Sequence, residues 1–302
     1  ILVSGHMDTV HPIGTLEKLP FRRDGDVCYG PGIQDMKGGN YVALEAVRQL
    51  IRAGIETPLP VTVLFTPDEE VGTPAARELV EMEASANRFV LVPEPAHGPS
   101  GAAVIGRYAI ARFNLRTVGK PSHAGWSLAE GRSAIAAMAR KVLEVEAMTT
   151  SDCTFSVGVF RAGQWVNCVS SFCDAEVLSM AKRQEDLDEG VAAMLALAGD
   201  VGGEVMLEVS RGVTRPVWEP DQPGTMAVYE IAREIAAEIG FDLPCGSAGG
   251  GSDGNFTGAL GIPTLDSIGV RGQGLHTLQE RIEIASLTER AKLFAGLLTR
   301  LK

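Results

Sequence analysis

Two different strand patterns divide this sequence of 302 residues. Before residue 106 and after residue 217, short apolar runs such as 61–65 alternate with helical patterns such as 39–53. Strands that are apolar on both faces are typical of a parallel sheet covered by helices. In contrast, residues 112–117 alternate apolar and polar side chains, which predicts a strand with one face in solvent. The pattern therefore predicts one α/β domain that a second domain interrupts.

The interrupting segment predicts a small α+β unit of its own. Its expected order is strand 112–117, helix 132–147, strands 154–160 and 172–180, helix 186–198 and strand 204–209. This βαββαβ order is the ferredoxin-like, split βαβ arrangement. We therefore expect a larger domain of residues 1–106 and 217–302 with a mostly parallel central sheet, and an inserted domain of residues 107–216.

The larger domain also allows local expectations. Its further elements are predicted at strand 1–3, strand 89–92, helix 224–239, strand 262–268 and helix 286–301. Thr73 and Pro74 are predicted to cap and begin a helix. Because Ile1 already lies inside a predicted strand, we expect an N-terminal segment to precede it in the natural protein.

Composition argues against two classes of partner. The formal net charge of −11 disfavours a nucleic-acid binder, and no apolar run reaches the length of a membrane span. The five cysteines form no CxxC pair, which indicates reduced thiols and a cytoplasmic location.

Three acids follow the buried strand 61–65. Asp68, Glu69 and Glu70 come directly after Thr66 and Pro67. Neighbouring residues of an extended chain point to opposite sides, so Glu69 and Glu70 could perform two different tasks. One could bind a metal ion while the other reaches toward a substrate. The alternative is an acidic turn in solvent, which is the expectation for Asp68.

Further candidate ligands lie at strand ends or in glycine-rich loops. They are His6 with Asp8 two residues later, Asp35, Glu94 between two prolines, and His276. Each alone has a structural alternative: a strand-end histidine, an N-cap aspartate, an ordinary turn or a loop histidine. Because sites in open α/β sheets form at the carboxyl ends of the strands, we expect these side chains to meet. Two histidines with three carboxylates suit zinc, with manganese or cobalt as alternatives.

The motifs GHMDT, GPGIQDMKGG, TPDEEVG, PEP and GQGLHT occur in this order along the chain. Together they resemble the dinuclear zinc family of aminoacylase, acetylornithine deacetylase, succinyl-diaminopimelate desuccinylase and glutamate carboxypeptidase. The resemblance covers essentially the whole chain, and it is strongest to the glutamate carboxypeptidase branch through GHMDTV, VTVLF and the stretch GGGSD.

The resemblance implies two Zn²⁺ ions per subunit, with Co²⁺ or Mn²⁺ as alternatives. The ligands that it implies are His6, Asp35, Glu70, Glu94 and His276. Asp35 would bridge both ions, His6 and Glu94 would complete one, and Glu70 with His276 the other. It also implies a cis peptide bond between Asp35 and Met36.

The remaining roles also come from the resemblance. Asp8 would orient His6, and Glu69 would act as general base and acid. In the motif GKPSHAG of the inserted domain, His123 would reach across a dimer to stabilise the oxyanion. The substrate contacts that it implies are Asn167, Arg215, Gly250 and Gly251.

One departure concerns Met180, which occupies the position where many relatives carry an arginine. Lys182 or Arg183 could replace the missing charge. His11 and His97 match no family role and are expected to be structural.

The implied activity is hydrolysis of an amide or peptide bond in a small N-acyl amino acid or short peptide with a free carboxylate, in the manner of a glutamate carboxypeptidase. The implied assembly is a homodimer through the inserted domain. Two alternatives stay open: an N-acyl amino acid deacylase of the acetylornithine deacetylase or desuccinylase type, and a metal-binding dimeric relative without catalytic activity.

Overall fold

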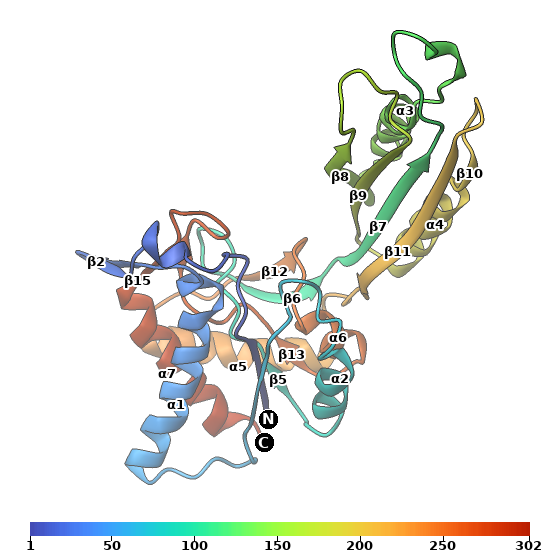
Figure 1. Ribbon diagram of the computed structural model, residues 1–302. Coiled ribbons are helices and arrows are strands. Elements are labelled where there is room, and N and C mark those ends of the chain that lie inside the picture. The colour runs from blue at the N-terminus through green and yellow to red at the C-terminus, as the bar shows by residue number, and fades with distance from the viewer. The chain divides into compact units, whose positions relative to one another are not determined.

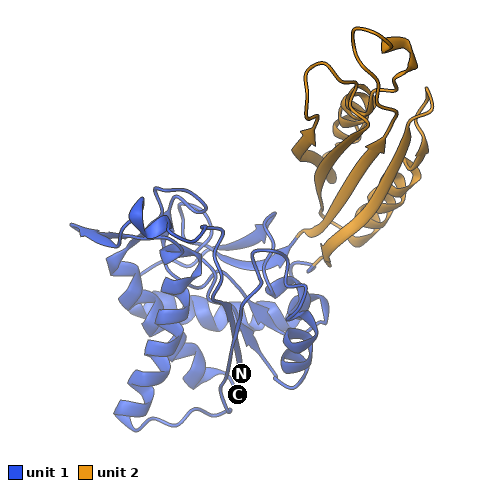
Figure 2. Ribbon diagram, in the orientation of Figure 1, with its two compact units in different colours: residues 1–107, 218–302 blue, residues 108–217 orange.

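The computed structural model describes residues 1–302 as two units (Figure 2). Unit 1 consists of Ile1–Arg107 and Trp218–Lys302, and unit 2 of Tyr108–Val217. Where the chain leaves unit 1 and returns to it, Arg107 and Trp218 each donate a backbone hydrogen bond of 2.9 Å to the other's carbonyl. The inserted segment therefore starts and ends at one paired position of unit 1.

A parallel sheet forms the centre of unit 1 (Figure 1). Its order is β13-β5-β1-β4, and every neighbouring pair is parallel. The bounds are β1 (Leu2–His6), β4 (Thr62–Thr66), β5 (Val90–Leu91) and β13 (Thr264–Leu265). Leu2 pairs with both Thr62 and Val90, so β1 is an interior strand, and all five of its residues are buried. The parallel α/β architecture predicted from the sequence is confirmed.

Helices cover both faces of this sheet, which explains why its strands are apolar on both sides. Val3 packs in a core with residues of α1 (Gly38–Ala53), α5 (Pro223–Ile239) and α7 (Ile284–Arg300). The neighbouring Leu2 packs instead with Ala84 of α2 (Arg77–Ser85). Adjacent residues of a strand point to opposite faces, and here each face has its own core.

Two smaller sheets complete unit 1. β6 (Ala103–Arg107) pairs in parallel with β12 (Cys245–Ala248), which precedes α6 (Gly254–Ala259). An antiparallel sheet has the order β14-β15-β3-β2, with β2 (Arg22–Asp24), β3 (Val27–Tyr29), β14 (Gly272–Gln273) and β15 (Arg281–Glu283). Pairing of β15 with β3 brings the loop after β3 next to the C-terminal part of the chain.

Short helical turns occur at Thr15–Glu17, Ile33–Lys37 and, in unit 2, Leu128–Glu130. The expected cis peptide bond is present between Asp35 and Met36, within the second of these turns. No helix of the chain combines the length and apolar character that crossing a membrane requires.

Unit 2 is an antiparallel sheet with the order β10-β11-β7-β9-β8. Its strands are β7 (Ala109–Val118), β8 (Cys153–Ala162), β9 (Phe172–Ala181), β10 (Gly199–Asp200) and β11 (Met206–Arg215), and its helices are α3 (Ala134–Ala147) and α4 (Gln184–Ala196). Phe113 and Leu115 of β7 share a core with Met138 of α3 and Leu187 of α4. Asn114, which lies between Phe113 and Leu115 in β7, is exposed. The βαββαβ order agrees with the sequence prediction, and the short β10 is an addition.

The predicted start of α2 is wrong. The helix begins at Arg77, and Thr73 has a positive φ of 59°. Its hydroxyl donates to Asp253 Oδ1 at 2.6 Å instead of capping the helix. Asp68 Oδ2 accepts hydrogen bonds from the amides of Ala75 and Ala76 at 2.7 and 3.2 Å, so this acid orders the turn before the helix.

The contact between Gly258 and Trp218 yields a stability prediction. A Cβ on Gly258 would lie 2.2 Å from Cγ of Trp218, whose side chain is fully buried. Alanine favours a helix by about 1 kcal/mol over glycine, but overpacking a rigid core costs about 1–3 kcal/mol. We therefore expect Gly258→Ala to lower the free energy of unfolding in urea titrations.

Gly246→Ala is the control, because nothing lies within 4 Å of its added Cβ. Equal stability of the two variants would contradict the packing argument.

Candidate metal and catalytic site

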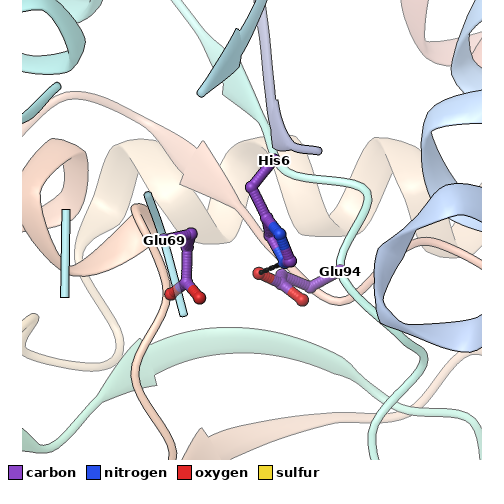
Figure 3. Close-up of side chains that lie close together, drawn as sticks. All are labelled: His6, Glu69 and Glu94. Carbon is purple, nitrogen blue, oxygen red and sulfur yellow. Dashed lines mark ion pairs between the residues drawn. The ribbon is translucent and has the colours of Figure 1, made fainter. Parts of the chain in front are cut away.

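His6, the last residue of β1, is the most buried member of the cluster, with 1% exposure. Its Nε2 lies 3.0 Å from Asp35 Oδ1. The same atom lies 3.7 Å from Glu94 Oε1, the contact that Figure 3 shows. Its Nδ1 lies 3.0 Å from the carbonyl oxygen of Asp8 and 3.3 Å from Asp8 Oδ1. Asp8 therefore holds one side of the ring and leaves Nε2 facing the carboxylates, which is a common arrangement behind a metal-binding histidine.

Asp35 connects the two candidate histidines. Its Oδ1 faces His6, while its Oδ2 lies 3.1 Å from Nε2 of His276. The same nitrogen of His276 lies 3.6 Å from Glu70 Oε2. One carboxylate thus stands between two imidazoles, and each imidazole has a further glutamate beside it: Glu94 near His6 and Glu70 near His276.

The fold explains why these residues meet. His6 pairs with Thr66 across the parallel strands β1 and β4, so the residues after both strands leave the sheet at the same edge. Glu94 follows β5, the other neighbour of β1. Carboxyl ends of parallel strands are the usual position of sites in such sheets. Asp35 comes from the turn before α1, and His276 from the turn after β14.

Asp8 also orients the two adjacent glutamates. Its Oδ1 accepts a hydrogen bond from the amide of Glu69 at 3.2 Å, and its Oδ2 from that of Glu70 at 3.0 Å. Ligand atoms of His6, Glu69 and Glu94 lie within 4.8 Å of one another, and so do those of His6, Asp35 and Glu70. The two neighbouring acids therefore belong to two different groups, and Figure 3 shows Glu69 opposite the His6–Glu94 pair.

The electrostatics of the cluster follow from crowded, buried carboxylates. Burial lowers the pKa of His6, but the hydrogen bond to Asp35 and the charge of Glu94 outweigh it and raise the pKa to about 11. Burial and the charge of Asp35 raise the pKa of Glu70 to about 7, and they raise that of Glu94 well above its usual value. The hydrogen bond to Asp35 raises the pKa of His276. Burial alone would raise the pKa of Asp35, but the two histidines hold it below its usual range.

This donor set fits divalent metal ions. It offers imidazole nitrogens and carboxylate oxygens, the ligands of zinc and related borderline metals. The raised pKa values of His6 and Glu94 mean that the crowded carboxylates favour added positive charge at this cluster. A cation can supply that charge and release protons from the ligands.

Three other expected site residues lie in unit 2. His123 and Asn167 are in adjacent loops, where the amide of Ala124 donates to the carbonyl of Asn167 at 2.9 Å. Nδ1 of His123 accepts a hydrogen bond from the amide of Gly125 at 3.1 Å. Arg215, the last residue of β11, is buried with 4% exposure.

The expected glycine loop lies in unit 1. The carbonyl of Gly250 accepts a 2.7 Å hydrogen bond from Nη1 of Arg107, and the adjoining Gly251 is half-buried. Arg107 is itself buried against Asp266, with 2.7 Å between Nε and Oδ2. The sequence did not point to Arg107, because its partner is 159 residues away.

The charge expected to compensate for Met180 is engaged elsewhere. Lys182 Nζ lies 3.4 Å from Asp152 Oδ1. Arg183 donates two hydrogen bonds of 2.9 Å to Asp186. Met180 itself pairs with Ile110 and Thr154 in the sheet of unit 2.

Sequence reasoning missed Glu280 and left His11 without a specific role. Glu280 is 1% exposed, and its Oε2 lies 2.6 Å from Nε2 of His11. The only local signal for Glu280 in the sequence is that this acid lies four residues after the candidate ligand His276.

Comparison with known proteins identifies the family. The model of peptidase family M20/M25/M40 matches residues 2–300. The chain belongs to this family. It is therefore a hydrolase of a metal-dependent peptidase family, and the resemblance inferred from the motifs is confirmed.

Individual relatives agree with this. The chain is 30% identical to carboxypeptidase G2 of Pseudomonas sp. (strain RS-16), over 99% of this chain and 73% of that protein. It is 26% identical to succinyl-diaminopimelate desuccinylase of Thioalkalivibrio sulfidiphilus, over 99% of this chain and 82% of that protein. The solved structure of a tripeptidase from Staphylococcus aureus matches with a TM-score of 0.82 and 25% identity, over 99% of this chain and 79% of that one.

Binding of a divalent ion to this M20 cluster should release protons. At neutral pH the His6 imidazole is protonated, because its pKa is raised to about 11, and the proton must leave before Nε2 can coordinate a metal. We expect release of about one proton or more per chain, and an apparent affinity that falls about tenfold per unit of decreasing pH. Calorimetric zinc titrations in buffers of different ionisation enthalpy measure the proton count.

The control for this titration is His97→Gln, because His97 is exposed and lies outside the cluster. It should leave the proton count unchanged. Zinc binding without proton release in the wild type would contradict the electrostatic description.

Proposed function

We propose that this chain is a two-metal hydrolase that cleaves an amide or peptide bond next to a free carboxylate, in the manner of a glutamate carboxypeptidase. The observation that carries the proposal is the position of Asp35, whose two oxygens lie 3.0 and 3.1 Å from the Nε2 atoms of His6 and His276. A carboxylate shared in this way suits a pair of metal ions.

Five residues would hold the ions: His6, Asp35, Glu70, Glu94 and His276. Asp35 would be common to both, His6 with Glu94 would serve one ion, and Glu70 with His276 the other. Zinc is the proposed metal, with cobalt or manganese as substitutes. Two such cations would supply Lewis-acid chemistry, polarising a carbonyl group and making a water molecule more acidic.

Glu69 would hold and move the proton. Its backbone is fixed by Asp8, and its carboxylate approaches the His6–Glu94 group. It would accept the proton of the attacking water and deliver it to the leaving amine, as a general base and then an acid. Asp8 would act through orientation of His6 and of the segment that carries both glutamates.

Unit 2 would supply further functional residues, of which His123 would act across the dimer. The amide of Gly125 donates to Nδ1 of His123, so the neutral ring carries its proton on Nε2. That nitrogen is then a donor suited to a developing oxyanion. We propose Arg215 and Asn167 as contacts of the substrate's carboxylate and amide, and the Gly250–Gly251 backbone as a further substrate contact.

The assembly that we propose is a homodimer formed through unit 2. β8 is the outer strand of its sheet, and the second backbone edge of such a strand is a template for pairing with another chain. A mass of about 32.0 kDa in solution light scattering, instead of twice this value, would exclude it. We further propose a cytoplasmic location, which the five unpaired cysteines support.

The carboxypeptidase activity has a deacylase activity as its main competitor. Similarity to carboxypeptidase G2 supports the first, and similarity to a desuccinylase supports the second. A matched panel of a peptide ending in glutamate, an N-acetyl amino acid and N-succinyl-diaminopimelate separates them through kcat/KM. We expect the highest value for the peptide ending in glutamate. A preference of about tenfold or more for either acyl compound would favour the deacylase.

A relative without catalytic activity is the remaining alternative. It is disfavoured because the full set of proposed ligands, Glu69 and His123 is present in this chain. Absence of turnover on the whole panel with metal bound would favour it instead.

Replacement of Glu69 by glutamine should reduce kcat by about 10²–10⁴-fold, the usual contribution of a general acid–base group. The metal content should stay the same, because the five proposed ligands remain. Glu78→Gln is the matched control on the exposed face of α2 and should keep wild-type turnover. Wild-type activity of the metal-loaded Glu69→Gln variant would exclude Glu69 as the base.

A further inference from the structure

A buried carboxylate lies behind the Asp35 turn. Oε2 of Glu280 accepts a hydrogen bond from the amide of Gly32 at 2.8 Å and lies 2.6 Å from Nε2 of His11. Its Oε1 accepts from the amides of Gln34 and Asp35 at 2.8 and 3.1 Å. With four such partners and 1% exposure, this carboxylate is fully paired inside the protein.

These contacts join the three segments that carry His6, Asp35 and His276. His11 lies five residues after His6, Glu280 lies four residues after His276, and the three amides belong to the Asp35 turn. The connection is long-range, because His11 and Glu280 are 269 residues apart.

Close packing supports the same connection. Gly32 has a positive φ of 65°, and a Cβ on it would lie 2.3 Å from Cγ2 of Thr9. Thr9 in turn accepts a hydrogen bond from the amide of His11 through Oγ1, at 3.2 Å. The segment after β1 therefore lies directly on the Asp35 turn, and His11 is hydrogen-bonded to the residue that makes this contact.

We infer that Glu280 and His11 form a positioning pair, which holds the Asp35 turn so that the two carboxylate oxygens stay aimed at His6 and His276. Neither residue would touch a metal ion or the substrate. Their effect would reach the site through the backbone of Gly32, Gln34 and Asp35. The inference rests on the proposed two-metal site and adds to it the residues that maintain its geometry.

The chemistry of the pair favours this role over a purely structural one. An ionised carboxylate is an acceptor only, and three backbone amides with one histidine occupy both of its oxygens. Hydrogen bonds to a charged acceptor are shorter and stronger than neutral ones. Supporting partners behind metal ligands typically change metal affinity or activity by about 10–100-fold when they are removed.

Cobalt titration of the chain of residues 1–302 tests the inference, with the visible absorption of bound Co²⁺ as a readout that is independent of turnover. Glu280→Gln keeps the size of the side chain but replaces one acceptor oxygen with a donor NH₂ group. We expect its Co²⁺ affinity to fall by about 10–100-fold and its absorption bands to shift. His11→Phe should have a smaller effect of the same kind, because it removes one of the four partners.

Two further variants make the outcome decisive. His11→Gln can still donate to Glu280 and should restore most of the affinity that His11→Phe loses. Tyr229→Phe removes a buried 2.8 Å hydrogen bond to the carbonyl of Leu243 in the core of unit 1, and it should leave the cobalt spectrum unchanged. If Tyr229→Phe weakened cobalt binding as much as Glu280→Gln, the effect would be one of general stability and the inference would be overturned.

The remaining outcomes separate this inference from the proposed function. A wild-type chain that binds no cobalt would overturn the metal site together with the positioning pair. A wild-type chain that binds two ions, with Glu280→Gln and His11→Phe equal to it in affinity and spectrum, would overturn the pair alone. If Glu280→Gln does not fold, the comparison of His11→Phe with His11→Gln decides the question, and equal affinities would refute the pair.

Discussion

The whole site depends on one carboxylate that two imidazoles share. Asp35 faces His6 with one oxygen and His276 with the other, and these three residues come from parts of the chain far apart in sequence. The parallel sheet supplies one half of the arrangement, because β1, β4 and β5 end at one edge. The antiparallel pairing of β3 with β15 brings the Asp35 turn, which follows β3, close to His276, which precedes β15. The arrangement therefore gathers more negative than positive charge at the carboxyl ends of the strands. Bound cations would neutralise this surplus charge.

Much of the site could be predicted because its signals are local. His6 ends one apolar strand, and Glu70 and Glu94 follow two others. The carboxyl ends of strands are the usual position of sites in an open α/β sheet. The predicted helix start at Thr73 failed because a tertiary contact with Asp253, 180 residues away, uses the hydroxyl that a cap would need. Glu280 could not be found, since its partners are set by the fold and not by the neighbouring sequence.

In unit 2, too, the sequence predicts the order of the helices and strands but not the roles of individual residues. Its alternating strand β7 and its two helices bury their apolar sides in a core of their own, so the order of elements could be inferred from periodicity alone. The roles of His123, Asn167 and Arg215 depend on contacts outside this core, which periodicity does not describe. They therefore remain proposals that the family resemblance suggests. For His123 alone, the hydrogen bond from the amide of Gly125 to Nδ1 leaves Nε2 as the donor of the neutral ring.

The reciprocal hydrogen bonds between Arg107 and Trp218 have a consequence for how such chains change. Because residues 108–217 leave and re-enter at one β-bridge, the closure of unit 1 does not depend on what the inserted segment contains. A short turn could link the two bridge residues, and a longer insertion could replace unit 2, without altering the register of β1 with its neighbours. At this bridge, the inserted residues 108–217 could therefore be replaced by another domain, in evolution or by design, while the fold of unit 1 is kept.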